Sequence, residues 1–179
     1  GAMGISVKGV YATAFPANLG MAATWNPELM DKAGVVIAQQ ARALNRDQVL
    51  GPLTGLARSP LSGRIFETYG EDPLLASRIV VSYISGVQGE GEIATAIFHA
   101  DAPRTRAARE FDARPMEAAV SEAGVWAVKP LPGSSIRDFV NGQLGFKGFT
   151  VSETAAPQDA DALDEQVRGI LRAMLANGI

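Results

Sequence analysis

The single histidine and two acidic side chains have the residue types and spacing that acid–base chemistry needs. His99 ends an apolar run, Asp101 follows it two residues later, and Glu153 directly follows another apolar run. A neutral imidazole transfers protons near neutral pH, and carboxylates at the carboxyl ends of core strands are common catalytic groups. We therefore predict that Glu153 and His99 are catalytic and that Asp101 orients the imidazole ring. The alternatives are a helix cap for Glu153 and a structural role for His99.

Lys129 is an unusual residue within its apolar run, residues 125–131. A lysine in a core strand must extend its amine to solvent, pair with an acid or line a pocket. Glu153 on an adjacent strand is the expected acid, which gives a plain ion pair as one interpretation. The other is a partly desolvated amine with a lowered pKa that acts as a base or binds a carbonyl.

Short apolar runs alternate with helical patterns along the chain, which is the order that produces parallel sheets covered by helices. The predicted strands are residues 47–53, 93–99, 125–131 and 146–152, with a weaker one near 7–12. The third and fourth runs are nearly all apolar, as expected for strands covered on both faces. The sequence therefore predicts an α/β protein.

Helices are predicted from capping residues and apolar stripes. Asn26 and Pro27 begin one, Pro73 begins another that Gly86 and Gly89 end, and Gly124 fits the left-handed cap of a third at about 107–122. Further helices are expected at 135–143 and 159–177, and the loop 54–70 is long enough to be functional. Apolar residues expected on buried faces or in the core include Trp25, Leu29, Val36, Phe98, Phe111, Trp126, Val167, Ile170 and Leu171.

Several motifs resemble family 3 glycoside hydrolases, the β-glucosidase family. They are residues 12–16 (ATAFP), 22–29 (AATWNPEL), 63–64 (GR), 67–73 (ETYGEDP), 145–152 (GFKGFTVS) and 167–174 (VRGILRAM). These blocks follow the family's order and span nearly the whole chain. The resemblance implies a catalytic barrel, a retaining glycosidase activity and a glycoside ligand.

The resemblance also implies roles for individual positions, with departures from the family. Glu153 stands where the family has its nucleophilic aspartate, and its extra methylene moves the carboxylate by about a bond length, a shift that costs rate. The family's Lys-His-Phe substrate clamp falls at Ile97, Phe98 and His99, so two polar groups are replaced by apolar ones. Ile97, Phe98 and Lys129 are predicted to contact the substrate.

The long loop keeps only part of the family's polar residues. Its usual aspartates correspond to Gly55 and Ser59, and its Arg-Trp pair corresponds to Leu61 and Ser62. Arg64 is retained, and we predict that it binds the substrate. The adjoining motif ETYGEDP resembles the part that orders the loop and caps the next helix.

The chain has 179 residues, whereas a complete barrel of this type takes about 250. We therefore predict that residues 5–179 form one truncated, TIM-barrel-like α/β domain with parallel strands, roughly half a barrel, and that residues 1–4 are an expression-tag remnant. Half a barrel has open edges and an uncovered inner face. A homodimer is expected to bury them, and a monomer with a rearranged open sheet is the rival.

Composition excludes several classes of function. Without cysteine the chain has no thiol nucleophile, disulfide or Cys-ligated metal, and no metal-ligand spacing or glycine-rich phosphate loop suggests a cofactor. A net charge of −3 argues against nucleic acid as a partner. No apolar run is long enough to span a bilayer and no secretory signal is visible, so we expect a cytoplasmic protein with no membrane partner.

Three functions remain open, and with them whether the protein is an enzyme. The first is a retaining glycosidase in which Glu153 is the nucleophile and His99 with Asp101 supplies the acid and base. The second is a repurposed isomerase, cyclase or lyase that performs acid–base chemistry on a less polar small molecule, because Ile97 and Phe98 would present apolar walls. The third is a non-catalytic relative that binds a small molecule.

Overall fold

A parallel sheet is the centre of the computed structural model, which describes residues 3–99, 106–130, 144, 146, 148–151, 167–172, 174 and 175. Within these residues the sheet has four strands in chain order: β1 (Gln48–Leu53), β2 (Ile93–Phe98), β3 (Ala127–Pro130) and β4 (Phe149–Thr150). The α/β class and these four predicted strands are confirmed, although β3 and β4 are shorter than expected. The predicted strand near 7–12 is wrong, because this segment contains a turn and irregular chain.

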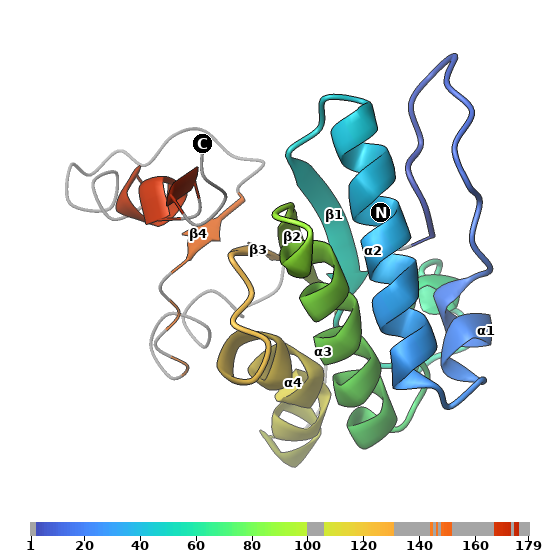
Figure 1. Ribbon diagram of the computed structural model, residues 1–179. Helices are drawn as coiled ribbons and strands as arrows, with labels where there is room; N and C mark the ends of the chain where they lie inside the picture. Colours follow the sequence, from blue (N-terminus) through green and yellow to red (C-terminus); the bar gives the residue numbers. More distant parts are fainter. Residues whose placement is uncertain are drawn as a thin grey trace.

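Helices α2 (Pro27–Ala43), α3 (Pro73–Gly89) and α4 (Arg106–Ser121) pack side by side over one face of the sheet (Figure 1). The side-chain oxygens of Asn26 and Asp72 accept hydrogen bonds from the backbone N–H groups of Leu29 and Leu75, at 3.0 and 2.8 Å. These bonds satisfy donors that the first turn of a helix leaves unpaired, which confirms both predicted starts. Gly124 has a φ of 59°, as its predicted cap requires.

The shorter elements lie at the edges of this layer. Helix α1 (Asn18–Ala22) precedes α2, and the 3-10 turn η1 (Ile65–Glu67) lies in the loop between β1 and α3. The predicted helix at 135–143 lies outside the described residues, and in the predicted helix at 159–177 the described residues, from 167 onward, are helical. None of the described helices is long and apolar enough to cross a bilayer.

Two glycines allow α2 and α3 to pack closely. A Cβ on Gly34 would stand 2.6 Å from the carbonyl oxygen of Tyr83, and a Cβ on Gly86 would overlap the carbonyl oxygen of Asp31. Gly86 therefore does not end α3, as its residue type suggested, but lies inside it at the helix–helix contact. The helix ends at Gly89.

The core lies between the helices and the sheet. Its largest fully buried side chains are Tyr69, Tyr83, Ile37, Ile79, Ile84 and Met116. β2 is buried along its whole length, and Phe98 belongs to this core as predicted. Trp126 is half-buried and packs on a smaller cluster around Ile93 and Ala127.

Several apolar side chains predicted to be buried are exposed instead: Trp25, Leu29, Val36, Phe111, Val167, Ile170 and Leu171. In α2 the buried face consists largely of small residues around Met30 and Ile37, so that the stripe is turned away from Leu29 and Val36. Trp25, which is 71% exposed, lies in the turn between α1 and α2. The exposed ring of Phe111 contacts two guanidinium groups, with Arg58 at 4.9 Å and Arg114 at 5.2 Å from its ring centre.

Candidate functional site

A cavity of about 610 Å³ is bounded by three strands, α1, η1 and the segment that precedes α1. Leu53, Ile97 and Lys129 line it from β1, β2 and β3. The strand register pairs Leu53 with Ile97 and Ile97 with Lys129. Side chains that are adjacent in register share one face of a sheet, so these three form a row along the cavity. The cavity therefore has a partly apolar floor with one amine at its end.

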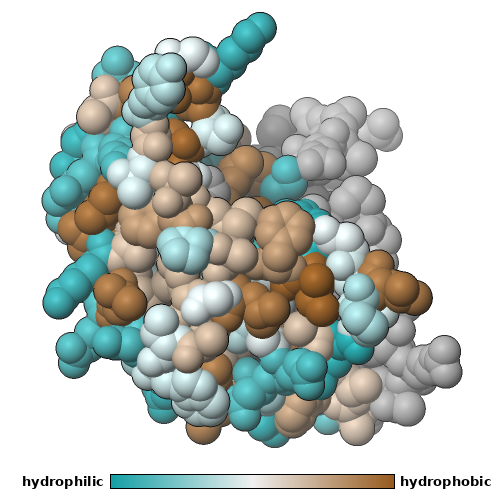
Figure 2. Space-filling model, turned by 90° about the vertical axis from the view of Figure 1, so that its right-hand side faces the viewer, coloured by the Kyte–Doolittle hydropathy of each residue, from teal (hydrophilic) through white to brown (hydrophobic). Residues whose placement is uncertain are grey.

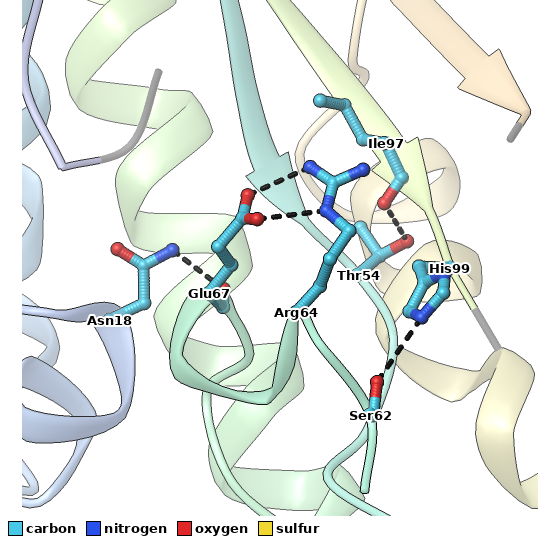
Figure 3. A network of polar contacts seen from close by, with 7 residues as sticks. All are labelled: Asn18, Thr54, Ser62, Arg64, Glu67, Ile97 and His99. Atoms are coloured by element: carbon cyan, nitrogen blue, oxygen red, sulfur yellow. Dashed lines mark hydrogen bonds and ion pairs between the residues drawn. The ribbon is translucent and has the colours of Figure 1, made fainter. Parts of the chain in front are cut away.

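Arg64 and Glu67 form a charged wall of the same cavity. Nε and one terminal nitrogen of Arg64 each donate a hydrogen bond of 2.8 Å to the Glu67 carboxylate, in a bidentate arrangement. The hydrogen bond to Glu67 raises the pKa of Arg64, and burial lowers it by less. Figure 3 shows the other terminal nitrogen turned toward Ile97. The wall therefore presents a fixed cationic donor to the cavity.

Asn18 supports this wall from α1. Its side chain is buried, and Nδ2 donates a hydrogen bond of 2.7 Å to the backbone oxygen of Glu67. Oδ1 has no hydrogen-bond partner among the described residues. Asn18 cannot be identified from the sequence, because one asparagine in a mostly apolar segment forms no recognisable pattern.

His99 lies immediately after β2 and contacts the loop that follows β1. Ser62 Oγ is 3.5 Å from His99 Nε2, and a Cβ on Gly55 would overlap the backbone oxygen of His99. The loop is joined to β2 through Thr54, whose N–H and hydroxyl both donate to the Ile97 oxygen, at 2.8 and 3.1 Å (Figure 3). No sequence pattern predicts a role for Ser62, because its contact with the imidazole depends on how the loop folds.

The structure brings together some of the predicted site residues. Arg64, Ile97 and Lys129 line the cavity. Phe98 does not line it, because adjacent strand residues point to opposite faces and its ring lies in the core. His99 also lies outside the cavity lining and contacts Ser62 instead. Glu153 and Asp101 lie outside the described residues.

The described side chains include no group of three histidines and acids that could hold a metal ion. The polar side chains that line the cavity are those of Arg64, Lys129, Glu67, Asn18, Ser6 and Thr13. Such groups can donate to and accept from several hydroxyls of one neutral ligand. The cavity's size is also in the range of small-molecule sites, about 300–1,000 Å³.

Residues 2–176 match the family model described as the glycosyl hydrolase family 3 N terminal domain. A β-glucosidase of Rhizobium radiobacter is 40% identical over 138 residues, which cover 70% of this chain and 17% of that protein. A β-xylosidase of Formosa agariphila is 36% identical over 176 residues, which cover 79% of this chain and 24% of that protein.

Solved structures of similar proteins show the same fold. DesR, a β-glucosidase from Streptomyces venezuelae in complex with D-glucose, has a TM-score of 0.78 at 32% identity, over 93% of this chain and 24% of that one. The β-D-glucoside glucohydrolase from Trichoderma reesei has a TM-score of 0.87 at 22% identity, over 99% and 34%, and shows the fold alone. The sheet is therefore part of a TIM-barrel-like fold, roughly half of its eight strands. The chain spans only about a sixth to a third of the length of these four proteins.

Proposed function

This chain belongs to glycosyl hydrolase family 3, and from that membership we propose that it binds the terminal sugar of a β-glycoside in the cavity beside Arg64. The observation that carries the proposal is the arrangement of Arg64, Glu67 and Lys129 around one cavity of about 610 Å³. A sugar hydroxyl both donates and accepts, so it can bind a cation and a carboxylate that stand side by side.

We propose that the reaction is retaining hydrolysis. The Glu153 carboxylate attacks the anomeric carbon while the His99 imidazolium, oriented by Asp101, protonates the departing oxygen, and water then hydrolyses the glycosyl ester with His99 as base. The role of His99 is supported by its position immediately after β2, at the strand end where barrel enzymes place catalytic groups, although its ring does not line the cavity beside Arg64. The roles of Glu153 and Asp101 rest on the sequence.

The test is hydrolysis of nitrophenyl β-glucoside and β-xyloside. Glu153→Gln is expected to abolish turnover, and Arg64→Lys to raise KM by about tenfold or more, because lysine has no bidentate fork for Glu67. Arg78→Lys is the matched control, since Arg78 forms an exposed ion pair with Glu122 on the helix layer. Turnover that survives Glu153→Gln would contradict the proposed role of Glu153 as the nucleophile. An unchanged KM in Arg64→Lys would contradict the proposed sugar site beside Arg64.

A second candidate function is favoured by the apolar part of the cavity. Leu50, Leu53 and Ile97 line it, and Leu50 is 45% exposed. These residues suit a less polar small molecule, on which the protein would perform acid–base chemistry or act as a binder only. Calorimetry with glucose and with an apolar aryl alcohol separates the two functions. For a less polar ligand, Ile97→Ser is expected to weaken binding, whereas Arg64→Lys leaves it unchanged.

We also propose that two copies of the chain associate. Figure 2 views the side that carries α1 and the segment before it, and shows tan and brown apolar surface across the middle of this face between teal borders. Exposed apolar residues on this side are Val10 and Tyr11 before α1, Leu19 in α1 and Trp25 in the turn after it. Apolar surface of this kind is typical of an interface. Sedimentation at micromolar concentration is expected to show a dimer, and a single 18.8 kDa species would rule it out.

A further inference from the structure

We infer that Asn18 is a positioning residue that sets the orientation of the Arg64 guanidinium in the cavity. Asn18 Nδ2 donates to the backbone oxygen of Glu67 at 2.7 Å, and the carboxylate of Glu67 accepts both hydrogen bonds from Arg64 at 2.8 Å. The three residues therefore form one chain of contacts from α1 to the cavity (Figure 3). The inference rests on the proposed binding of a glycoside beside Arg64.

The hydrogen bond to Glu67 fixes the orientation of the Asn18 amide. A backbone oxygen only accepts, so the amide must present its nitrogen, because a flipped amide would set two acceptors against each other. The amide donor is therefore the atom that fastens α1 to η1. The two partners are 49 positions apart in the sequence.

An amide at this position does not serve stability alone. Asn18 is 2% exposed, and its Oδ1 has no hydrogen-bond partner in the part of the chain that the structure describes. A buried acceptor without a partner destabilises a fold, whereas a leucine of similar size adds no such group. What the asparagine supplies, and leucine cannot, is the N–H that holds Glu67.

The segment that Asn18 anchors is a short one. η1 is a single 3-10 turn of three residues, closed by backbone bonds from Glu67 to Arg64 at 3.0 Å and from Thr68 to Ile65 at 3.1 Å. Turns of this kind are short and have poor hydrogen-bond geometry. Without the anchor from Asn18, we expect Glu67 to shift and the long side chain of Arg64 to leave its cavity-facing position.

The test is Asn18→Leu, with D-glucose and nitrophenyl β-glucoside as probes. The glucose Kd and the KM are expected to rise by about tenfold, with kcat nearly unchanged, because Arg64 binds rather than reacts. In nuclear magnetic resonance the Nε–H of Arg64 is expected to exchange faster with solvent, an effect that a purely structural role of Asn18 would not produce. An unchanged Kd and unchanged Arg64 exchange would overturn the inference.

Two further variants provide an alternative to Asn18→Leu and a matched control. Asn18→Asp retains the shape but not the donor and is expected to weaken binding similarly, so it decides the question if Asn18→Leu does not fold. Gln88→Leu is the matched control, because the Gln88 amide also bonds backbone groups, at Gly124 and Trp126, away from the cavity. It is expected to lower the melting temperature and leave Kd unchanged. If wild-type protein binds neither probe, the proposed function fails first; if it binds both and Asn18→Asp binds equally well, only the inference fails.

Discussion

Gly55 and His99 approach so closely that no side chain fits at position 55 without moving the backbone at position 99. A Cβ on Gly55 would overlap the carbonyl oxygen of His99. The contact lies where the loop after β1 crosses the end of β2, next to the bond from the Thr54 N–H to the Ile97 oxygen. The aspartate that the family resemblance implies at position 55 is therefore incompatible with this arrangement of loop and strand.

The first prediction is that Gly55→Ala destabilises the protein and displaces His99. Overpacking of this kind costs about 1–3 kcal/mol, because backbone must move to admit the methyl group. The measurements are the free energy of unfolding in urea and the imidazole resonances of His99. Gly63→Ala in the same loop is the control, since a Cβ there meets nothing within 4 Å. Equal stabilities of the two variants would contradict the close contact.

The second prediction concerns the contact between α2 and α3. Gly86→Ala is expected to lower the free energy of unfolding by more than about 1 kcal/mol, because its methyl group would overlap the carbonyl oxygen of Asp31. Gly89→Ala, in the same helix but with open space around the Cβ, is expected to stabilise by up to about 1 kcal/mol through helix propensity. Thermal unfolding of both variants checks the opposite signs. A stabilising Gly86→Ala would mean that the helices are farther apart.

Local signals explain which parts of the fold could be predicted. The strands follow from apolar runs, and the starts of α2 and α3 follow from Asn26, Asp72 and the prolines after them, because capping depends on neighbouring residues only. The position of Gly86 inside α3 could not be predicted, because a glycine that ends a helix and a glycine that admits a second helix look alike in sequence. The exposure of Trp25 could not be predicted, because the orientation of α1 and α2 decides it.

Some residues of the candidate site could likewise be predicted from the sequence, and others could not. Arg64, Ile97 and Lys129 could be found because a motif or a strand position marks each of them, and all three line the cavity. Asn18 and Ser62 could not be found, because their importance comes from partners far along the chain, at Glu67 and His99. Such contacts depend on how loops fold, and no local pattern encodes them.

The third prediction is a pH dependence caused by Glu92. Burial raises the pKa of Glu92 from its ordinary value of 4.5, and the hydrogen bond from Arg42 at 3.1 Å only partly lowers it. Because its pKa is higher in the folded state, the Glu92 carboxyl contributes fully to the free energy of unfolding below pH 4.5. This contribution is lost as pH rises through the folded-state pKa. Wild type is therefore expected to lose stability relative to Glu92→Gln as pH rises from about 4.5 to 7.

Urea unfolding across this pH range measures the difference. Glu122→Gln is the control, because the Glu122 side chain is 50% exposed in its pair with Arg78, and exposed pairs contribute little. We expect its effect on the free energy of unfolding to be small. A difference between wild type and Glu92→Gln that stays constant with pH would show that the carboxyl has the same pKa in both states.

The fourth prediction concerns two buried phenols. Tyr69 and Tyr83 are fully buried, and neither hydroxyl has a hydrogen-bond partner among the described residues. Burial raises the pKa of both above the ordinary 10, and the nearby Tyr83 raises that of Tyr69 further. The two neutral phenols therefore contribute fully to the free energy of unfolding below pH 10. This contribution is lost as pH rises, because the same phenols ionise at lower pH in the unfolded chain than in the folded protein.

Tyr83→Phe is therefore expected to shift alkaline unfolding to higher pH. At neutral pH the same variant should be as stable as wild type or slightly more stable, because it removes a buried hydroxyl that makes no hydrogen bond. Circular dichroism during an alkaline titration measures the first effect, and thermal unfolding near pH 7 measures the second. Tyr11→Phe, at a fully exposed position, is the control and should change neither. A loss of stability at neutral pH in Tyr83→Phe would mean that the hydroxyl is hydrogen-bonded after all, through a buried water or a shifted neighbour.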